Sequence, residues 1–264
     1  MTDDAIDTSV PHSARVWNYW LGGRDNYEVD RLAGDRYRAA YPGVVDVARA
    51  CRGFLARSVR HLAGPVGIRQ FLDIGAGLPA PDNVHEIAQR IAPESRVVYV
   101  DNDPLVLAHA RALLVSGPKG AADYVAADLR DPEKILVAAR TTLDLTRPVG
   151  LLLNGVLGHI GDDEEARSIV RRLLDGLPSG SHLAVNDGTK VVHPRESAEG
   201  VRGYNATGAV PYRLRDPEQI AGFLDGLDLV PPGVVSCSRW HPEAPREGAS
   251  IPEVDAFCGV GRKP

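Results

Sequence analysis

From about residue 66 onward, short apolar runs alternate with segments of helical periodicity. The alternation predicts helices over residues 83–91, 104–115, 132–140 and 162–177. Repeated strand–helix units of this kind favour an α/β fold with a parallel, doubly wound sheet and right-handed crossovers. The first five strands are predicted within IRQFLDIG, RVVYVD, ADYVAAD, VGLLLNGVL and SHLAVND.

The last two predicted strands, within GVVSCSRW and VDAFCGVGRK, follow a helix expected over residues 217–227. The loop between these strands, residues 241–252, is rich in proline and lacks helical periodicity. A parallel pair would need a crossover of about a dozen residues or more, which is usually helical. We therefore expect an antiparallel hairpin, and with it a seven-stranded sheet that is mostly parallel with an antiparallel last strand.

The N-terminal part of the chain has helical periodicity over residues 13–21, 28–41 and 44–62. Ser13 is a suitable N-cap for the first helix, and Gly22 and Gly23 end it. We therefore divide the chain into an N-terminal helical extension, residues 1–65, and an α/β domain, residues 66–264. The extension is unusual in composition, because the chain has only 6% aromatic residues and yet RVWNYWLGGRDNY contains two Trp and two Tyr.

The first predicted strand leads into DIGAGLPA, in which Gly75, Gly77 and Ala80 have G-x-G-x-x-A spacing. Asp101 lies about twenty residues further on, at the end of the second predicted strand. Together they match the fingerprint of dinucleotide-binding folds, in which glycines allow a tight turn and the acidic residue accepts the ribose hydroxyls. An NAD(P)-dependent oxidoreductase is one interpretation, and a tight turn without a ligand is another.

The charges of the loop and of the ligand help to decide which cofactor such a loop binds. Asp73 lies just before Gly75, and NAD would bring a pyrophosphate to the same turn. A carboxylate about 4 Å from one phosphate charge costs roughly 4 kcal/mol at an effective dielectric constant of about 20. S-adenosylmethionine (SAM) has no phosphate and carries an ammonium and a sulfonium, which an acidic loop suits. Pro79 also lacks a backbone N–H, a loss that matters more for binding a phosphate than a cation.

Two carboxylates at strand ends are candidates for holding the adenosine. Asp101 would accept hydrogen bonds from both ribose hydroxyls. Asp128, which ends the third predicted strand, would accept one from the adenine amino group, with the Leu129 N–H beside it. The alternative interpretation of Asp128 is an N-cap of the helix that begins near Pro132.

These features resemble class I SAM-dependent methyltransferases, whose Rossmann-like fold has a D-x-G-x-G loop, seven strands and an antiparallel terminal hairpin. This resemblance covers residues 66–264. Segments along almost the full chain also resemble the actinobacterial S-adenosyl methyltransferase family, long known only as a domain of unknown function. The segments are SARVWNYWLGGRDNYEVDR, FLDIGAGLPAPDNVHEIAQ and YNATGAVPYRLRDPEQIAGFLDGL. The resemblance implies SAM as the cofactor and methyl transfer as the reaction.

The chain departs from the methyltransferase pattern at two places. Pro79 and Ala80 stand where the loop usually has a third glycine. Many relatives carry two adjacent histidines after the fourth strand, where this chain has Gly158 and His159, so a mechanism based on paired histidines is not expected. His159 alone is a candidate general base for an acidic nucleophile, and a helix-capping or solvent-facing role is the alternative.

The aromatic N-terminal segment is a candidate lid, because ligands of this fold bind beyond the carboxyl ends of the strands. Trp17, Tyr19 and Trp20 would pack over the adenosine or face the sulfonium. Gly23 would let the backbone approach the ligand, and residues 24–26 would order the turn or reach the methionine end of SAM. The alternative is that the aromatic residues only anchor an extra helix to the sheet.

Further candidates lie after the fourth and fifth strands. Asn154 ends the fourth strand, where the methyl group is expected. Residues 187–215 lack clear periodicity and are expected to form a substrate-facing lid, with Tyr204 as a candidate catalytic residue. The predicted cofactor-binding residues are Asp73, Gly75, Ala76, Gly77, Asp101, Asn102, Asp128, Leu129, Asn154, Tyr19 and Gly23.

Composition limits the partners. A net charge of −5 does not indicate a surface that follows nucleic-acid phosphates. The three cysteines form no C-x-x-C pair, so we expect neither a disulfide framework nor a metal site. The N-terminus lacks the apolar core of a signal peptide, and the run PVGLLLNGVLGHI is too short to cross a bilayer.

We therefore expect a cytoplasmic, SAM-dependent methyltransferase that acts on a small-molecule methyl acceptor of unknown identity. Neither nucleic acid nor a membrane is expected as a partner. A non-catalytic SAM-binding protein is the remaining alternative.

Overall fold

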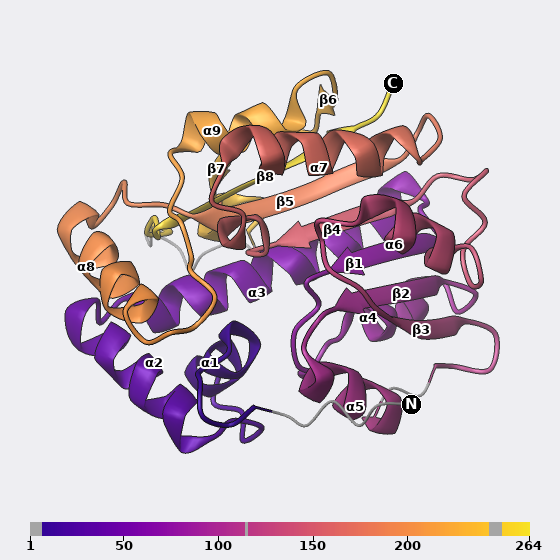
Figure 1. Cartoon of the computed structure of the whole chain (residues 1–264). Helices are drawn as coiled ribbons and strands as arrows, with labels where there is room; N and C mark the ends of the chain where they lie inside the picture. Colours follow the sequence, from indigo (N-terminus) through magenta and orange to yellow (C-terminus); the bar gives the residue numbers. More distant parts are fainter. Residues whose placement is uncertain (1–6, 114–115, 243–249) are drawn as a thin grey trace.

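The computed structural model describes residues 7–113, 116–242 and 250–264. These residues form a sheet of eight strands with helices on both faces (Figure 1). The strand order is β3-β2-β1-β4-β5-β8-β6, and β7 also pairs with β8. The strands are β1 (Gln70–Ile74), β2 (Arg96–Asp101), β3 (Ala121–Ala126), β4 (Gly150–Asn154), β5 (His182–Gly188), β6 (Asp228–Leu229), β7 (Val235–Ser236) and β8 (Ala256–Arg262).

The strand directions confirm the predicted sheet. Strands β1 to β5 run parallel, and β8 is antiparallel to β5. Both β6 and β7 pair antiparallel with β8, so two short strands share the place of the predicted sixth strand. Pro231 and Pro232 lie between them, and proline has no N–H to donate to a sheet. Most of the loop predicted over residues 241–252 lies outside the described residues.

The helices begin and end close to the predicted positions, although residues 114–115 of the fourth predicted helix lie outside the described residues. Short helical turns cover Leu62–Val66, Leu157–His159, Gly222–Leu224 and Cys237–Arg239. Within the part of the chain that the structure describes, no helix combines the length and apolar character needed to span a membrane. The helices are α1 (Ser13–Trp20), α2 (Glu28–Ala40), α3 (Val44–His61), α4 (Val84–Ile91), α5 (Pro104–Leu113), α6 (Pro132–Ala139), α7 (Asp163–Asp175), α8 (Pro194–Asn205) and α9 (Pro217–Ala221).

The sheet separates two apolar cores because successive side chains of a strand point to opposite faces. On β1, Phe71 packs with α3 and α4, whereas Leu72 packs with α6 and α7. The neighbouring strands alternate in the same way, with Leu152 facing the first core and Leu151 the second. This near-continuous burial of apolar residues explains why the strands are readable from the sequence.

The first helix is built into the domain. Val16 and Trp20 of α1 are buried in the same core as Phe54 of α3. The residue that caps α1 is His12, one position before the predicted Ser13, and its ring accepts a hydrogen bond from the Ala14 N–H at 3.3 Å. Figure 1 shows α1, α2 and α8 gathered beyond the carboxyl ends of β4 and β5.

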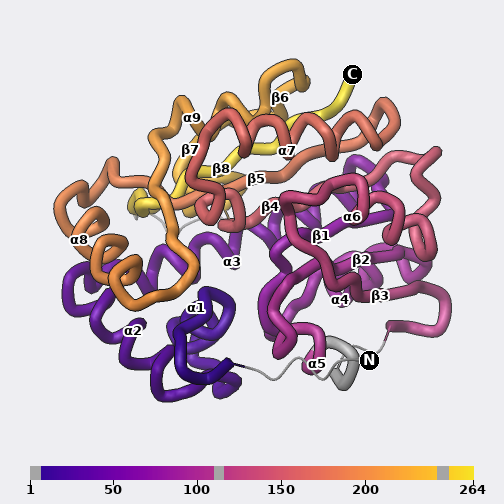
Figure 2. The backbone as a smooth tube through the Cα atoms, in the orientation of Figure 1, coloured from indigo at the N-terminus to yellow at the C-terminus, as the bar shows by residue number. Residues whose placement is uncertain are grey.

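The absence of clear periodicity over residues 187–215 is misleading, because Pro194–Asn205 forms helix α8. Its buried residues, Ser197, Gly200, Val201 and Tyr204, have helical spacing, but most are small or polar. The apolar pattern that marks a helix is therefore missing. The tube in Figure 2 shows α8 beside α2, although the two are far apart in the sequence. Gly200 allows this approach, since a Cβ there would lie 2.5 Å from Tyr37 of α2.

Candidate active site

A cavity of about 420 Å³ opens at the carboxyl ends of β1 to β4. It lies between β1 and β4, whose following helices, α4 and α7, cover opposite faces of the sheet. Open α/β sheets bind ligands at such a topological switch point. The walls come from the loop after β1, the ends of β2, β3 and β4, and the N-terminal helix α1.

The glycine loop is held in shape by backbone hydrogen bonds to β2. Gly75 and Gly77 have φ angles of +74° and +67°, which favour glycine. The N–H of Gly75 donates to the carbonyl of Val100 at 2.8 Å. A Cβ at position 75 would lie 2.5 Å from the Val156 side chain, whereas none of the described residues would lie within 4 Å of one at position 77. Gly77 therefore leaves open space on the cavity side, where Ala76 and Asn102 also lie.

Asp101 connects the glycine loop to the end of β2. Its carboxylate accepts hydrogen bonds from the N–H of Gly77 at 2.9 Å and from the N–H of Asp103 at 3.0 Å. A carboxylate has about four lone-pair sites, so it can still accept from a ligand. Burial raises the pKa of Asp101 above its usual value, and the two backbone N–H groups oppose that rise.

Asp73 is a buried carboxyl at the base of the same loop. Burial raises its pKa to about 7, Arg52 opposes the rise, and Asp101 adds to it. A cation placed here would stabilise the ionised form of Asp73, and a phosphate would destabilise it further. The electrostatics of the loop therefore favour a positively charged ligand.

The third strand places Asp128 and Leu129 in the cavity wall. The cap of helix α6 is Asp131, whose side chain accepts from the Lys134 N–H at 3.3 Å. The alternative interpretation of Asp128 as that cap is thus wrong. Asp128 accepts a hydrogen bond from the Arg130 N–H at 2.8 Å, and its carboxylate is about half exposed toward the cavity.

Asn154, at the end of β4, carries a donor without a partner. Its Oδ1 accepts a hydrogen bond from Asn186 Nδ2 on β5 at 2.8 Å. Its own Nδ2 is buried and has no hydrogen-bond partner among the described residues. Such a donor is costly unless a ligand uses it, so the site fits a ligand with an acceptor oxygen at this point.

The N-terminal segment lines one side of the cavity through Trp17, Asn18, Leu21 and Gly23. The Oδ1 atom of Asn18 accepts from the Asp25 N–H at 3.0 Å and from Asn26 Nδ2 at 2.8 Å, which orders the turn after the helix.

Tyr19 is not brought to the cavity. Its hydroxyl donates to Asp35 at 2.8 Å on the other side of α1. The aromatic residues of α1 therefore have different roles: Trp17 faces the cavity, Trp20 is buried in the core, and Tyr19 packs against the core while its hydroxyl bonds Asp35.

His159 lies on the turn after β4 and lines the cavity. Its Nδ1 is 3.1 Å from the carbonyl oxygen of Pro211. A carbonyl only accepts, so Nδ1 carries the proton and Nε2 is the atom able to take one. Burial lowers the pKa of His159, which keeps the ring neutral near pH 7. Gly158 beside it has no room for a side chain, since a Cβ would lie 2.3 Å from the Tyr212 ring.

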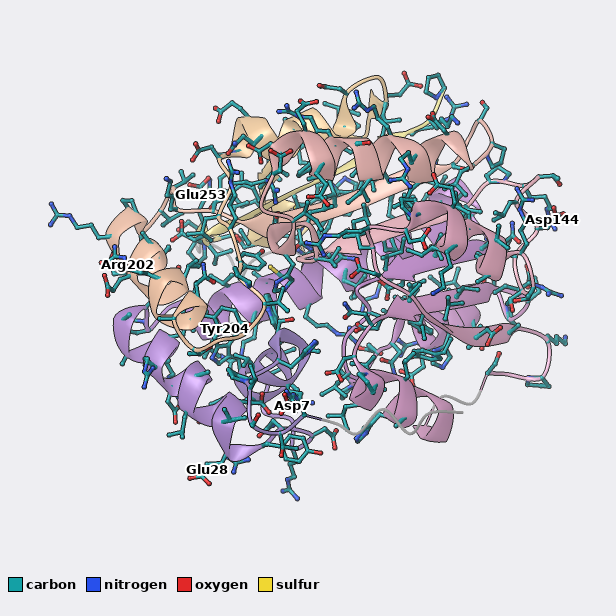
Figure 3. The ribbon with its side chains drawn as sticks, in the orientation of Figure 1. Asp7, Glu28, Asp144, Arg202, Tyr204 and Glu253 are labelled. Carbon is teal, nitrogen blue, oxygen red and sulfur yellow. The ribbon has the colours of Figure 1, made fainter. Side chains whose placement is uncertain are left out.

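Tyr204 lies in a smaller chamber of about 60 Å³, behind the main cavity. The chamber and the cavity share Trp17, His159 and Asn186 in their walls. Figure 3 labels Tyr204 at the end of α8 that approaches α1. Burial raises the pKa of its hydroxyl, so Tyr204 remains protonated and acts as a hydrogen-bond donor or acceptor, not as a base.

Several polar residues of the cavity wall escape the sequence analysis, among them His12, Arg52 and Asn186. The ring of His12 lies against the carboxyl of Asp103, with Nδ1 3.0 Å from one oxygen, and so brings the N-terminal segment to the end of β2. Arg52 of α3 donates to the Asp82 carbonyl at 2.9 Å. Asn186 lies within a buried strand. None belongs to a motif, and only tertiary packing brings them to the cavity.

Comparisons with known proteins cover almost the whole chain, and they agree on one family. The model of the S-adenosyl methyltransferase family matches residues 1–264. A DUF574 family protein from Streptomyces avermitilis MA-4680 is similar with a TM-score of 0.94 and 47% identity, over 98% of this chain and 100% of that chain. A protein from Thermobifida fusca YX, solved as a candidate methyltransferase, has a TM-score of 0.89 and 38% identity, over 99% and 98%.

For more distant structures, the similarity is limited to the fold. An O-methyltransferase family protein from Burkholderia thailandensis is 16% identical with a TM-score of 0.52, over 93% of this chain and 63% of that chain. Among curated protein sequences, none is significantly similar to this chain.

Proposed function

This chain belongs to the S-adenosyl methyltransferase family, and we propose that its carboxyl-end cavity binds SAM for methyl transfer to a small molecule. The chain is a SAM-dependent methyltransferase, so neither an NAD(P)-dependent oxidoreductase nor a non-catalytic protein is retained as an interpretation. When bound, SAM supplies a methyl group activated by a sulfonium. The residues of the protein bind and orient SAM and the methyl acceptor, and they exclude water from the site.

In the proposed site, each candidate residue has a separate task. Asp101 accepts from the ribose hydroxyls, with the acceptor capacity that two backbone N–H groups leave free. Asp128 and the Leu129 N–H hold the adenine. Asp73 is the counter-ion for the ammonium, and Asn154 Nδ2 donates to an oxygen of the methionine carboxylate.

The observation that carries this proposal is the buried Asp73 beside Asp101 in the glycine loop. Burial and the nearby Asp101 raise the cost of ionising Asp73, and a cationic ligand lowers this cost whereas a pyrophosphate increases it. Calorimetric titration with S-adenosylhomocysteine and with NADH tests it. We expect binding of the first only; tight NADH binding without a response to S-adenosylhomocysteine would remove the proposal.

The affinity for S-adenosylhomocysteine is expected to increase about tenfold between pH 5.5 and pH 7. Asp73 is protonated in the free protein below its pKa of about 7, and a bound ammonium needs the ionised form. Binding therefore releases a proton below pH 7, and affinity rises with pH until it levels off above that value. The ligand's own amino group stays protonated over this range. Titrations at a series of pH values measure the slope.

The control for this pH dependence is Asp73→Asn, which has no proton to release. This variant should bind weakly at both pH values, with a nearly flat profile. A slope equal to that of the unaltered protein would assign the proton to another group.

We propose His159 as the general base and the N-terminal segment as a lid. With Nδ1 donating to Pro211, the neutral ring can accept a proton from the methyl acceptor at Nε2. Trp17 and Gly23 face the cavity, while Val16 and Trp20 hold the helix in the core. The segment thus combines both roles considered for it: an anchored helix whose C-terminal end covers the cofactor.

Trypsin should cut after Arg24 several-fold more slowly when S-adenosylhomocysteine is bound. Arg24 is exposed in the turn that follows α1, next to the cavity-lining Gly23. A ligand that contacts this turn stabilises its closed form against the opening that proteolysis needs. Limited digestion at saturating ligand, followed by mass spectrometry, gives the rate at this site.

Cleavage after Arg202, on the exposed face of α8, serves as the internal control. It should change less than cleavage after Arg24. Equal protection at both sites would indicate general stabilisation, and no protection at either would make the segment a scaffold only.

A further inference from the structure

The chamber behind the cofactor cavity has the composition of a small aromatic pocket. Six of the residues that line it are Trp or Tyr, and they come from α1, α2 and α8 and from the segments that follow α2 and α8. Trp17 packs edge-to-face on Trp20 at 5.9 Å, and Trp20 does so on Tyr37 at 5.1 Å. The aromatic residues that line it are Trp17, Trp20, Tyr37, Tyr41, Tyr204 and Tyr212.

Two hydroxyls in this wall have no partner. Tyr204 is 5% exposed and Thr189 is fully buried. Neither Tyr204 Oη nor Thr189 Oγ1 has a hydrogen-bond partner within the described ranges. Ser13 is near enough to lower the pKa of Tyr204 but is not in hydrogen-bonding geometry. Burying an unpaired hydroxyl is costly, so both point to a ligand that offers a polar group.

The charges around the chamber favour a neutral ligand. Of the residues described, no Lys or Arg lines it, so an anion would lack a counter-ion. Its one carboxylate, Asp255, already accepts hydrogen bonds from the hydroxyls of Tyr41 and Ser197 and from the N–H groups of Val192 and His193. Little acceptor capacity remains there for an ammonium.

The volume of the chamber and the basicity of its neighbour His159 narrow the class of ligand further. About 60 Å³ is well below the roughly 150 Å³ of a cavity that encloses a benzene ring, so the chamber takes one edge of a ring whose remainder extends into the adjoining cavity. The neighbouring His159 is a weak base, because burial lowers its pKa. A phenol, with a pKa of about 10, yields its proton to such a base far more readily than an aliphatic alcohol does.

We propose that this chamber, defined by Tyr204, Thr189 and the aromatic wall, is the inner part of the methyl-acceptor pocket and that it takes one edge of a single uncharged phenolic ring, the rest of which lies in the adjoining cavity. The proposal rests on the proposed function of the adjoining cavity. In the transfer, the phenol oxygen gains the methyl carbon as the sulfur–methyl bond breaks. The phenolic proton passes to His159 Nε2, and the sulfonium becomes the neutral thioether of S-adenosylhomocysteine.

The test is calorimetric titration of the protein, saturated with S-adenosylhomocysteine, with 4-methylphenol. We expect saturable binding that is at least severalfold tighter than binding of toluene, 4-hydroxybenzoate or benzylamine. Tyr204→Phe and Thr189→Val keep the shape of the wall and should each weaken 4-methylphenol binding by about fivefold while leaving toluene unchanged. His159→Gln should retain binding and lose transfer of labelled methyl from SAM.

Tyr124→Phe is the matched control, because Tyr124 stacks on Tyr99 away from the chamber. It should bind 4-methylphenol as the unaltered protein does. Binding of S-adenosylhomocysteine is measured first in each variant, so failure of the cofactor site is seen separately. If that ligand binds and 4-methylphenol binds no better than toluene, or if benzylamine or 4-hydroxybenzoate binds best, the phenol pocket is refuted.

Discussion

Replacement of Arg215 by Met is expected to lower the free energy of unfolding by about 3–5 kcal/mol, the usual cost of breaking a buried ion pair. The guanidinium is fully buried and donates to Asp187 at 2.9 Å. It also donates to the carbonyls of Leu157 at 2.8 Å and Ile160 at 2.7 Å. Met has a similar volume, so the loss comes from the broken ion pairs with Asp187 and Asp163 and from the two carbonyls that lose their donor.

The same replacement should disturb catalysis, because Leu157 and Ile160 flank His159. Without Arg215 the turn that carries the proposed base loses two of its anchors. Urea unfolding, followed by circular dichroism, measures the stability, and methyl transfer from labelled SAM measures the activity.

Arg213→Met is the matched control for this prediction. Arg213 is about half exposed and donates to Asp163 at 2.7 Å. Surface pairs of this kind contribute about 0–1 kcal/mol. Equal destabilisation by both variants would contradict the role assigned to the buried pair.

The loss caused by Arg215→Met should also depend on pH. Burial already raises the pKa of Asp187, and removal of the guanidinium takes away the main opposing effect. Because the folded pKa then exceeds the unfolded one, the penalty is small at low pH and grows as the carboxyl is forced to ionise. The variant should therefore be closer in stability to the unaltered protein at pH 5 than at pH 8.

Asp101→Ala is expected to weaken binding of SAM or S-adenosylhomocysteine by about 1.5–3 kcal/mol, or roughly 10- to 150-fold. The variant loses the acceptor proposed for the ribose hydroxyls. It also frees the N–H of Gly77, which shapes the glycine loop. The fold should survive because Asp101 ends its strand instead of packing in the apolar core. Calorimetry gives the dissociation constant, and circular dichroism checks the fold.

Two further variants test whether the loss of affinity comes from the carboxylate of Asp101 itself. Asp123→Ala removes an exposed carboxylate of β3 that bonds Thr142, away from the cavity, and should leave affinity unchanged. Asp101→Asn keeps the volume and one acceptor oxygen, so its affinity should be intermediate. An unaltered dissociation constant in Asp101→Ala would remove this residue from the cofactor site.

Much of the proposed cofactor cavity is predictable because its chemistry is local. Gly75, Gly77 and Asp101 are constrained by a strand–turn–helix unit whose spacing is written in the chain. Asp73 and Asp128 follow from the rule that parallel strands end at one edge. Each of these residues lines the cavity that the sequence predicts.

Other parts of the site depend on distant partners. The chamber around Tyr204 needs α8, whose buried face lacks an apolar pattern, and α1, which is separated from it by most of the chain. The unpaired states of Thr189 and Asn154 are also invisible locally, since a missing partner is a property of everything nearby.

The sequence by itself determined the parallel sheet, the glycine loop and the acidic ligand environment, because these depend on periodicity, steric freedom and charge over short stretches. Only the tertiary structure decided that Trp17 faces the cavity, that Trp20 is buried and that the Tyr19 hydroxyl bonds Asp35 instead of reaching the cavity. Neighbouring residues of one helix differ in role because each meets a different element. The surroundings of each residue are set by packing between segments that are far apart in the sequence, and the local pattern does not show which segments these are.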